Sequence, residues 1–317
     1  MSLLDTFTTA ILPIVTVTGV GVVLGRLRDV DVEPLNTVTV YVLLPALVFH
    51  SVATAAFDGA TLARVGAATL AYIIVMLVVA EAAGRLLGES EPLLSALVLL
   101  SAFPNSGNYG IPLSTFAFGN TGRSTAVLFL AVQGVLTYTV GVYVAGRSGG
   151  TAGVAGMKRA LRVPLVYAVV VAVAARWVGV VPPADGTAMQ TVELVGEASI
   201  PVMLLILGVY LAETDYGAVL GQVGSATVLK TLVAPVVGVV IVTVVGFDDP
   251  TVARTFVLQC ATPAAITPLL LLVEFGDESV GDVSVAEYAS TVVLVTTVLS
   301  VPVLTVLIAA LEAGLVV

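Results

Sequence analysis

Hydrophobic residues run through the chain in long stretches, and most charged residues fall between those stretches. An α-helix needs about 20 apolar residues to cross the hydrocarbon of a bilayer. By this criterion the pattern predicts an all-α polytopic membrane protein. Its ten expected spans cover residues 7–25, 35–56, 62–84, 92–118, 124–145, 161–181, 188–211, 217–245, 252–275 and 286–311.

The fourth and ninth of these spans contain residues that break helices. A proline removes the donor for the carbonyl four residues earlier, and an unsatisfied backbone group in lipid costs several kcal/mol. Such backbone is tolerated at membrane depth only where protein or a watery cavity surrounds it, and a matched pair of broken helices marks the binding site of many transporters. The pattern therefore predicts a carrier. The interrupting residues are Pro104, Gly107, Gly110 and Pro112 in the fourth span, and Pro263 and Pro268 in the ninth.

Composition agrees with a membrane protein and removes several other classes of function. Hydrophobic residues make up 58% of the 317 positions, and charged residues only 10%, against about 25% in soluble domains. Because Cys260 and His50 are the lone cysteine and histidine, the sequence predicts no metal site, no cofactor and no enzymatic chemistry based on Ser–His or zinc. The net charge of −9 argues against nucleic acid as a partner, and with only two lysines it resembles the style of salt-loving archaea.

The chain also divides into two halves that resemble each other. A Gly-rich basic segment, residues 146–160, separates residues 1–145 from residues 161–317, and each half holds five predicted spans. Pro45 and Pro201 are 156 residues apart (201 − 45), as are Pro112 and Pro268 (268 − 112). An odd number of spans per repeat makes the second copy run in the opposite direction, so inverted repeats are expected. The bias of Lys and Arg toward one side predicts that both termini lie outside, with the linker inside.

Three segments resemble one known family. PNSGNYGIP at 104–112, LLPALVF at 43–49 and ATPAAITPLL at 261–270 are similar to the auxin efflux carrier family, and the resemblance extends over the whole ten-span layout. It implies two inverted five-span repeats, a fold shared more distantly with bile-acid sodium symporters. It further implies a dimerising scaffold of spans one, two, six and seven, a mobile transport domain in which the broken spans cross, and a location in the cytoplasmic membrane. The substrates that it implies are small organic anions such as malate, malonate or indole-acetate, carried by an elevator motion.

The polar residues of the two breaks are the candidate substrate ligands. Asn105 and Asn108 can bind the substrate, because half-helix N-termini direct positive dipole ends into a break, or they can tie up loosened backbone groups. At an offset of 156 their counterparts are Ala261 and Ala264, which argues against a symmetric cation site and against sodium coupling. The full set of predicted substrate-binding residues is Asn105, Ser106, Asn108, Tyr109, Gln259, Thr262, Thr267 and Lys230.

Two charged positions within spans have alternative interpretations. Lys230 lies about 12 residues into the eighth span, so it needs a partner, and it serves either as a tether to a carbonyl or carboxylate or as a charge that attracts anions. Glu193 and Glu197 share one helix face in the seventh span, and Glu197 either handles protons or has a structural or interface role. For the whole protein, a ligand-binding membrane sensor or a channel of the same fold remains the alternative to a carrier.

Overall fold

The computed structural model describes residues 3–28, 30–55, 57–89, 91–147, 164–213, 222–275, 279–280 and 283–316. Within these ranges the regular elements are helices, apart from one short ladder between β1 (Ser279–Val280) and β2 (Val283–Ser284). Seven helical stretches are long and apolar enough to cross a membrane, and α6 (Leu93–Ala102) and α10 (Pro164–Val178) are shorter apolar helices. The predicted class, a helical multi-pass membrane protein, is confirmed, whereas the count of ten spans stays a prediction.

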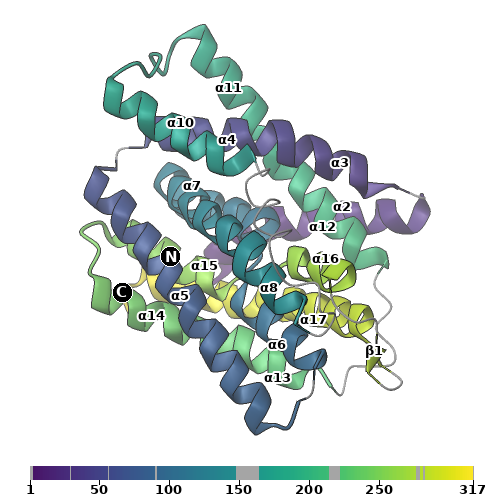
Figure 1. Cartoon of the computed structure of the whole chain (residues 1–317). Helices are drawn as coiled ribbons and strands as arrows, with labels where there is room; N and C mark the ends of the chain where they lie inside the picture. Colours follow the sequence, from purple (N-terminus) through teal and green to yellow (C-terminus); the bar gives the residue numbers. More distant parts are fainter. Residues whose placement is uncertain are drawn as a thin grey trace.

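Prolines shape the helices of both halves (Figure 1). Four of the five π-helical turns in the described chain lead directly into a helix with proline at its first or second position. A proline ring pushes away the carbonyl four residues earlier, and a widened turn accommodates this without ending the helix. The first half contains α1 (Leu3–Thr6), η1 (Phe7–Ile11), α2 (Leu12–Leu27), α3 (Val32–Val38), η2 (Thr39–Leu43), α4 (Leu44–Thr54), α5 (Gly59–Leu86), α6, η3 (Ser106–Gly110), α7 (Ile111–Leu136), η4 (Thr137–Gly141) and α8 (Val142–Ala145).

The second half begins with α10 and continues through a kinked pair, α11 (Thr187–Glu197) and α12 (Ser199–Glu213). The predicted seventh span is therefore two consecutive helices that meet at Ala198. Predicted span eight is represented by a π-bulged helix, and predicted span nine by two short helices with a gap between them. These elements and the last helix are α13 (Gly224–Val228), η5 (Leu229–Val233), α14 (Ala234–Val245), α15 (Pro250–Ala261), α16 (Ile266–Phe275) and α17 (Val285–Glu312).

The helices pack as two groups. In the first helix group α2 packs against α12, and α4 packs against α10 and α11. In the second helix group α5, α6, α7, α14, α15, α16 and α17 pack among themselves. The groups meet chiefly where α7 contacts α4 and α10 and where η3 contacts α12, and Figure 1 shows α7 between α4 and α5. The first break, between α6 and α7, thus lies beside the boundary between the groups.

Glycines bring α2 and α12 into very close contact. A Cβ atom on Gly208 would lie 2.1 Å from the carbonyl oxygen of Thr18 and 2.7 Å from Cα of Gly21. In lipid, helices associate largely through such close backbone packing of small residues. The extended contact between α2 and α12 therefore depends on the absence of a side chain at Gly208.

Gly208→Ala is expected to destabilise the protein by about 1–3 kcal/mol, because the added methyl has only backbone atoms to displace. The measurement is the melting temperature in detergent. Gly19→Ala on α2 is the matched control, since among the described residues no atom outside its own stretch of helix lies within 4 Å of its added Cβ, and it should be neutral or stabilising. Equal melting temperatures for the two variants would contradict the close-packing account.

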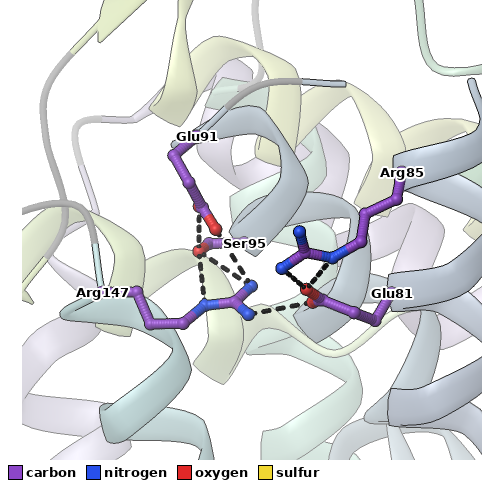
Figure 2. Close-up of polar contacts among 5 residues, drawn as sticks. All are labelled: Glu81, Arg85, Glu91, Ser95 and Arg147. Atoms are coloured by element: carbon purple, nitrogen blue, oxygen red, sulfur yellow. Dashed lines mark hydrogen bonds and ion pairs between the residues drawn. The ribbon is translucent and has the colours of Figure 1, made fainter. Parts of the chain in front are cut away.

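A network of charged side chains joins the ends of α5 and α6 to Arg147, the second residue after α8 (Figure 2). Nη1 of Arg147 lies 2.9 Å from Oε2 of Glu81, and its Nη2 lies 3.3 Å from Oε1 of Glu91. Ser95 donates to Glu91 at 2.6 Å, and Arg85 pairs with Glu81 one turn away. The network holds these ends of the second helix group together. Of the predicted linker, only residues 146 and 147 belong to the described chain, so the proposed domain division at 146–160 stays a prediction.

Candidate functional site

Both predicted breaks are interruptions of the helical backbone. The first half-helix of each pair, α6 and α15, ends at Ala102 and Ala261 respectively. Helical geometry resumes at Ser106 in η3 and at Ile266 in α16. Of the predicted break residues, Pro104 and Pro263 lie in the non-helical segments. The others lie within the first seven residues of the second half-helices: Gly107 and Gly110 in η3, Pro112 at the second position of α7, directly after that π-helical turn, and Pro268 at the third position of α16. Proline is well tolerated in the first turn of a helix.

The two breaks pair with each other. The amide of Asn105 donates to the carbonyl of Pro263 at 2.7 Å, and the amide of Ala265 donates to the carbonyl of Phe103 at 3.1 Å. Together they form an antiparallel bridge centred on Pro104 and Ala264. Each break therefore supplies hydrogen-bond partners that the other lost, which satisfies the requirement for broken backbone in a membrane.

The half-helix ends differ in register from the proline pairs. Ala102 and Ala261 are 159 residues apart (261 − 102), three more than the predicted offset of 156. On this register the counterpart of Asn105 is Ala264, and the counterpart of Asn108 is Thr267 (108 + 159). The paired prolines at 112 and 268 stand at different positions of their helices, so they do not report the register of the breaks.

A cavity of about 160 Å³ opens beside this bridge, where both second half-helices begin. The first residues of η3 and of α16 line it, so two helix N-termini converge on one space. Residues of α3, η2, α4, α10 and α12 form the facing wall, which places the cavity between the two helix groups. The lining residues are Asn36, Thr39, Val40, Leu44, Pro104, Asn105, Ser106, Gly107, Asn108, Leu130, Gln133, Gly134, Thr137, Tyr138, Leu165, Tyr210, Ala265, Ile266, Thr267 and Leu270.

The electrostatics of this cavity come from dipoles and amides. None of the lining residues in the described chain is Asp, Glu, Lys, Arg or His. The N-terminus of a helix carries about half a positive charge together with free amide donors, so it favours an anion. Low dielectric strengthens this preference in a buried site. The cavity is therefore polar and attractive to negative charge without holding a fixed charge.

Asn105 has the most informative environment in the cavity. The residue is 5% exposed, and its Nδ2 atom has no hydrogen-bond partner in the described structure. A buried amide donor without a partner costs free energy, so such groups call for an explanation. A ligand with an acceptor oxygen in the cavity supplies one. Asn108, half-buried, lines the same cavity.

Sequence reasoning missed Gln133. From α7 its Nε2 donates to the carbonyl of Pro104 at 2.8 Å, and its Oε1 accepts from the hydroxyl of Ser106 at 2.8 Å. Both ends of one amide thus brace the first break and fix the wall of the cavity. An amide within the apolar fifth predicted span was the available signal, but its partners lie 27 and 29 residues away in the chain.

The structure gathers only part of the predicted ligand set. Asn105, Ser106, Asn108 and Thr267 line the cavity, whereas Tyr109, Gln259, Thr262 and Lys230 do not. The latter residues support the crossing from behind. Gln259 donates to Ser114 at 2.7 Å, Thr262 donates to the carbonyl of Gln259 at 2.8 Å, and Ser300 lies 3.0 Å from the Tyr109 hydroxyl.

Lys230 is fully buried at the C-terminal end of α15. Its Nζ donates to the carbonyl of Cys260 at 3.2 Å and lies 3.3 Å from the hydroxyl of Tyr72, which donates to the same carbonyl. The C-terminus of a helix carries a partial negative charge that favours a cation. This position matches the tether alternative that the sequence left open. Glu197 lies apart from the crossing and forms an ion pair with Arg123.

Comparison with known proteins places this geometry in a family. The model of the family described as "Membrane transport protein" matches residues 6–155 and 152–308. The chain belongs to this family. Auxin efflux carriers are part of it, so the resemblance carried by the broken segments is confirmed.

Two relatives cover nearly the same length. One, named "Putative malonate transporter", from Rhizobium meliloti (strain 1021), is 25% identical over 314 residues, which is 96% of this chain and 95% of the relative. Another, named "Uncharacterized transporter", from Methanothermobacter thermautotrophicus (strain Delta H), is 26% identical over 284 residues, which is 85% of this chain and 88% of the relative. The family and both names indicate membrane transport of a small molecule.

Proposed function

We propose that this membrane transport protein is a secondary carrier of a small organic anion, of the carboxylate class, which binds in the cavity at the crossing of the two breaks. The observation that carries the proposal is the unpartnered Nδ2 of Asn105, in a cavity on which two helix N-termini converge. A carboxylate offers acceptor oxygens to that amide and negative charge to both dipole ends. The relative that is named "Putative malonate transporter" supports a dicarboxylate as the substrate, with one carboxylate near each half-helix.

The transport motion is proposed from the position of the cavity. Its walls come from both helix groups, so sliding the second group along the first would carry the bound anion across the membrane. The first group would be the fixed scaffold and dimer interface, in the cytoplasmic membrane with both termini outside. The mutual pairing of the breaks supports inverted repeats, because two segments of opposite direction meet around one bridge.

Ion coupling is the part of the mechanism that the cavity supports least. No carboxylate side chain of the described chain lines it, and the two helix N-termini that face it carry partial positive charge, which disfavours a cation. We therefore propose transport without sodium bound at the crossing. Uptake that depends on a sodium gradient would contradict this.

Counterflow in proteoliposomes tests the function. Vesicles loaded with unlabelled malonate should accumulate labelled malonate transiently, with saturable rates, and succinate, acetate and a neutral diester serve as competitors. Carboxylates should compete and the diester should not, because only the acids carry the charge. Non-saturable flux without counterflow would identify a channel, and binding without flux would identify a sensor.

A further inference from the structure

A second polar cavity lies on the same boundary between the helix groups. It has a volume of about 330 Å³ and is lined by His50, Asn120, Thr121, Arg123, Ser124 and Glu193, among others. The first cavity includes Leu44 of α4 and Gln133 of α7, and the second includes Thr54 and Arg123 of the same helices. Ten residues of α-helix correspond to about 15 Å. The two cavities therefore lie about 15 Å apart along the boundary between the two helix groups.

Arg123 is the central residue of this second cavity. It is 5% exposed, and Nη1 pairs with Oε1 of Glu197, while its Nε has no hydrogen-bond partner in the described structure. A buried guanidinium is costly unless it is paired and its donors are satisfied. The Nε donor of Arg123 is not satisfied within the described structure, and Arg123 lines a cavity that has room for a ligand. The neighbouring Ser124 donates to the carbonyl of Ser51 at 3.1 Å, which fixes this part of α7 against α4.

The partner carboxylate is held far less firmly than the arginine. The side chain of Glu197 is 47% exposed, so it can exchange the guanidinium for water at small cost. The carboxylate of a ligand presents the same chemistry as Glu197, and a second acceptor group on the ligand would offer a partner to Nε, which has none among the described residues. Asn120, Thr121 and Ser124 are polar residues that also line the space.

The other charged groups near Arg123 do not replace its partner. Glu193 lines the cavity from α11, and its Oε1 lies 3.9 Å from Nε2 of His50. Arg176 of α10 is engaged with the carbonyls of Val52, Ala55 and Phe57 at the end of α4. Among the described residues, Glu197 is the only carboxylate within 4 Å of the Arg123 guanidinium.

We infer that the second cavity is a carboxylate-binding site, in which the guanidinium of Arg123 takes the carboxylate of a small organic acid in place of Glu197. The choice of ligand class rests on the proposed function. Because Arg123 belongs to the second helix group and Glu197 to the first, binding here also removes an ion pair between the groups. It is a second binding site for the transported acid, separate from the crossing, where Glu197 and the acid compete for Arg123.

Chemical rescue of Glu197→Gln tests this site. The variant leaves Arg123 buried without its anion, so its melting temperature should fall, and sodium malonate should raise it again by about 3 °C or more relative to sodium chloride of equal ionic strength. All proteins in the series carry Asn105→Ala, so that binding at the crossing contributes little. Glu193→Gln is the matched control, because it removes the same charge from the same helix at nearly the same exposure, 45%. It should show no malonate-specific rise of that size.

The double variant Arg123→Gln, Glu197→Gln decides the role of the guanidinium. Loss of the malonate effect in this variant supports the site, whereas rescue that persists in it, or that chloride matches, overturns it. If Glu197→Gln does not yield folded protein, it is prepared in malonate and, separately, in chloride. Recovery only in malonate supports the site, and failure in both overturns it. These measurements do not depend on transport. A failed counterflow assay would therefore contradict the proposed function, whereas a failed rescue would contradict the second site.

Discussion

Replacing Asn105 with alanine is expected to weaken binding of the transported anion about 10- to 150-fold, as calorimetric titration of the detergent-solubilised protein would show. A hydrogen bond to a charged ligand contributes about 1.5–3 kcal/mol, and each 1.4 kcal/mol corresponds to a factor of ten. The melting temperature without ligand should stay near that of the wild type, because Nδ2 of Asn105 has no hydrogen-bond partner to lose among the described residues.

Asn105→Asp sharpens the result. It keeps the size of the side chain but replaces the donor with a negative charge, so anion affinity should fall further than in Asn105→Ala. The alternative is that Asn105 only ties up loosened backbone. That alternative predicts unchanged affinity with a lower melting temperature, and this combination would remove Asn105 from the proposed site.

The two breaks could be predicted from the sequence because each is caused by residues within its own segment. Pro104 and Pro263 remove backbone donors in apolar surroundings, and that loss is visible in a single chain segment. The register of the crossing is not local in this sense. Prolines near helix starts are tolerated at several positions, so the pair at 112 and 268 indicated an offset of 156 although the half-helices end 159 residues apart.

Partners far apart in the chain account for the rest of what sequence reasoning did not resolve. The depth of Lys230 in its span was predictable, but its acceptor, the carbonyl of Cys260, appears only when α15 ends beside it. Gln133 and Arg123 were not singled out, because an amide or a guanidinium gains meaning from what it reaches. In each case hydropathy indicates that a polar group needs a partner, and tertiary packing decides which one.

Gly110→Ala is expected to disrupt the crossing itself. A Cβ at this position would lie 2.3 Å from Oε1 and 2.9 Å from Cδ of Gln259. Gln259 is fully buried and is held by its 2.7 Å hydrogen bond to Ser114, so it has little freedom to move away. Overpacking of this kind costs about 1–3 kcal/mol. Because η3 also forms the cavity wall, the variant should lose counterflow activity as well as melting temperature.

Gly107→Ala is the matched control within the same π-helical turn. Its Cβ would lie 3.7 Å from Cδ2 of Leu130, an ordinary van der Waals distance, so its melting temperature should not fall. Adding Gln259→Ala to Gly110→Ala removes the atoms that clash, and the double variant should be more stable than the sum of the two single effects predicts. If the effects of the two substitutions on stability are strictly additive, Gly110 is required for a reason other than its contact with Gln259. The close approach of α15 would then not explain the loss of counterflow.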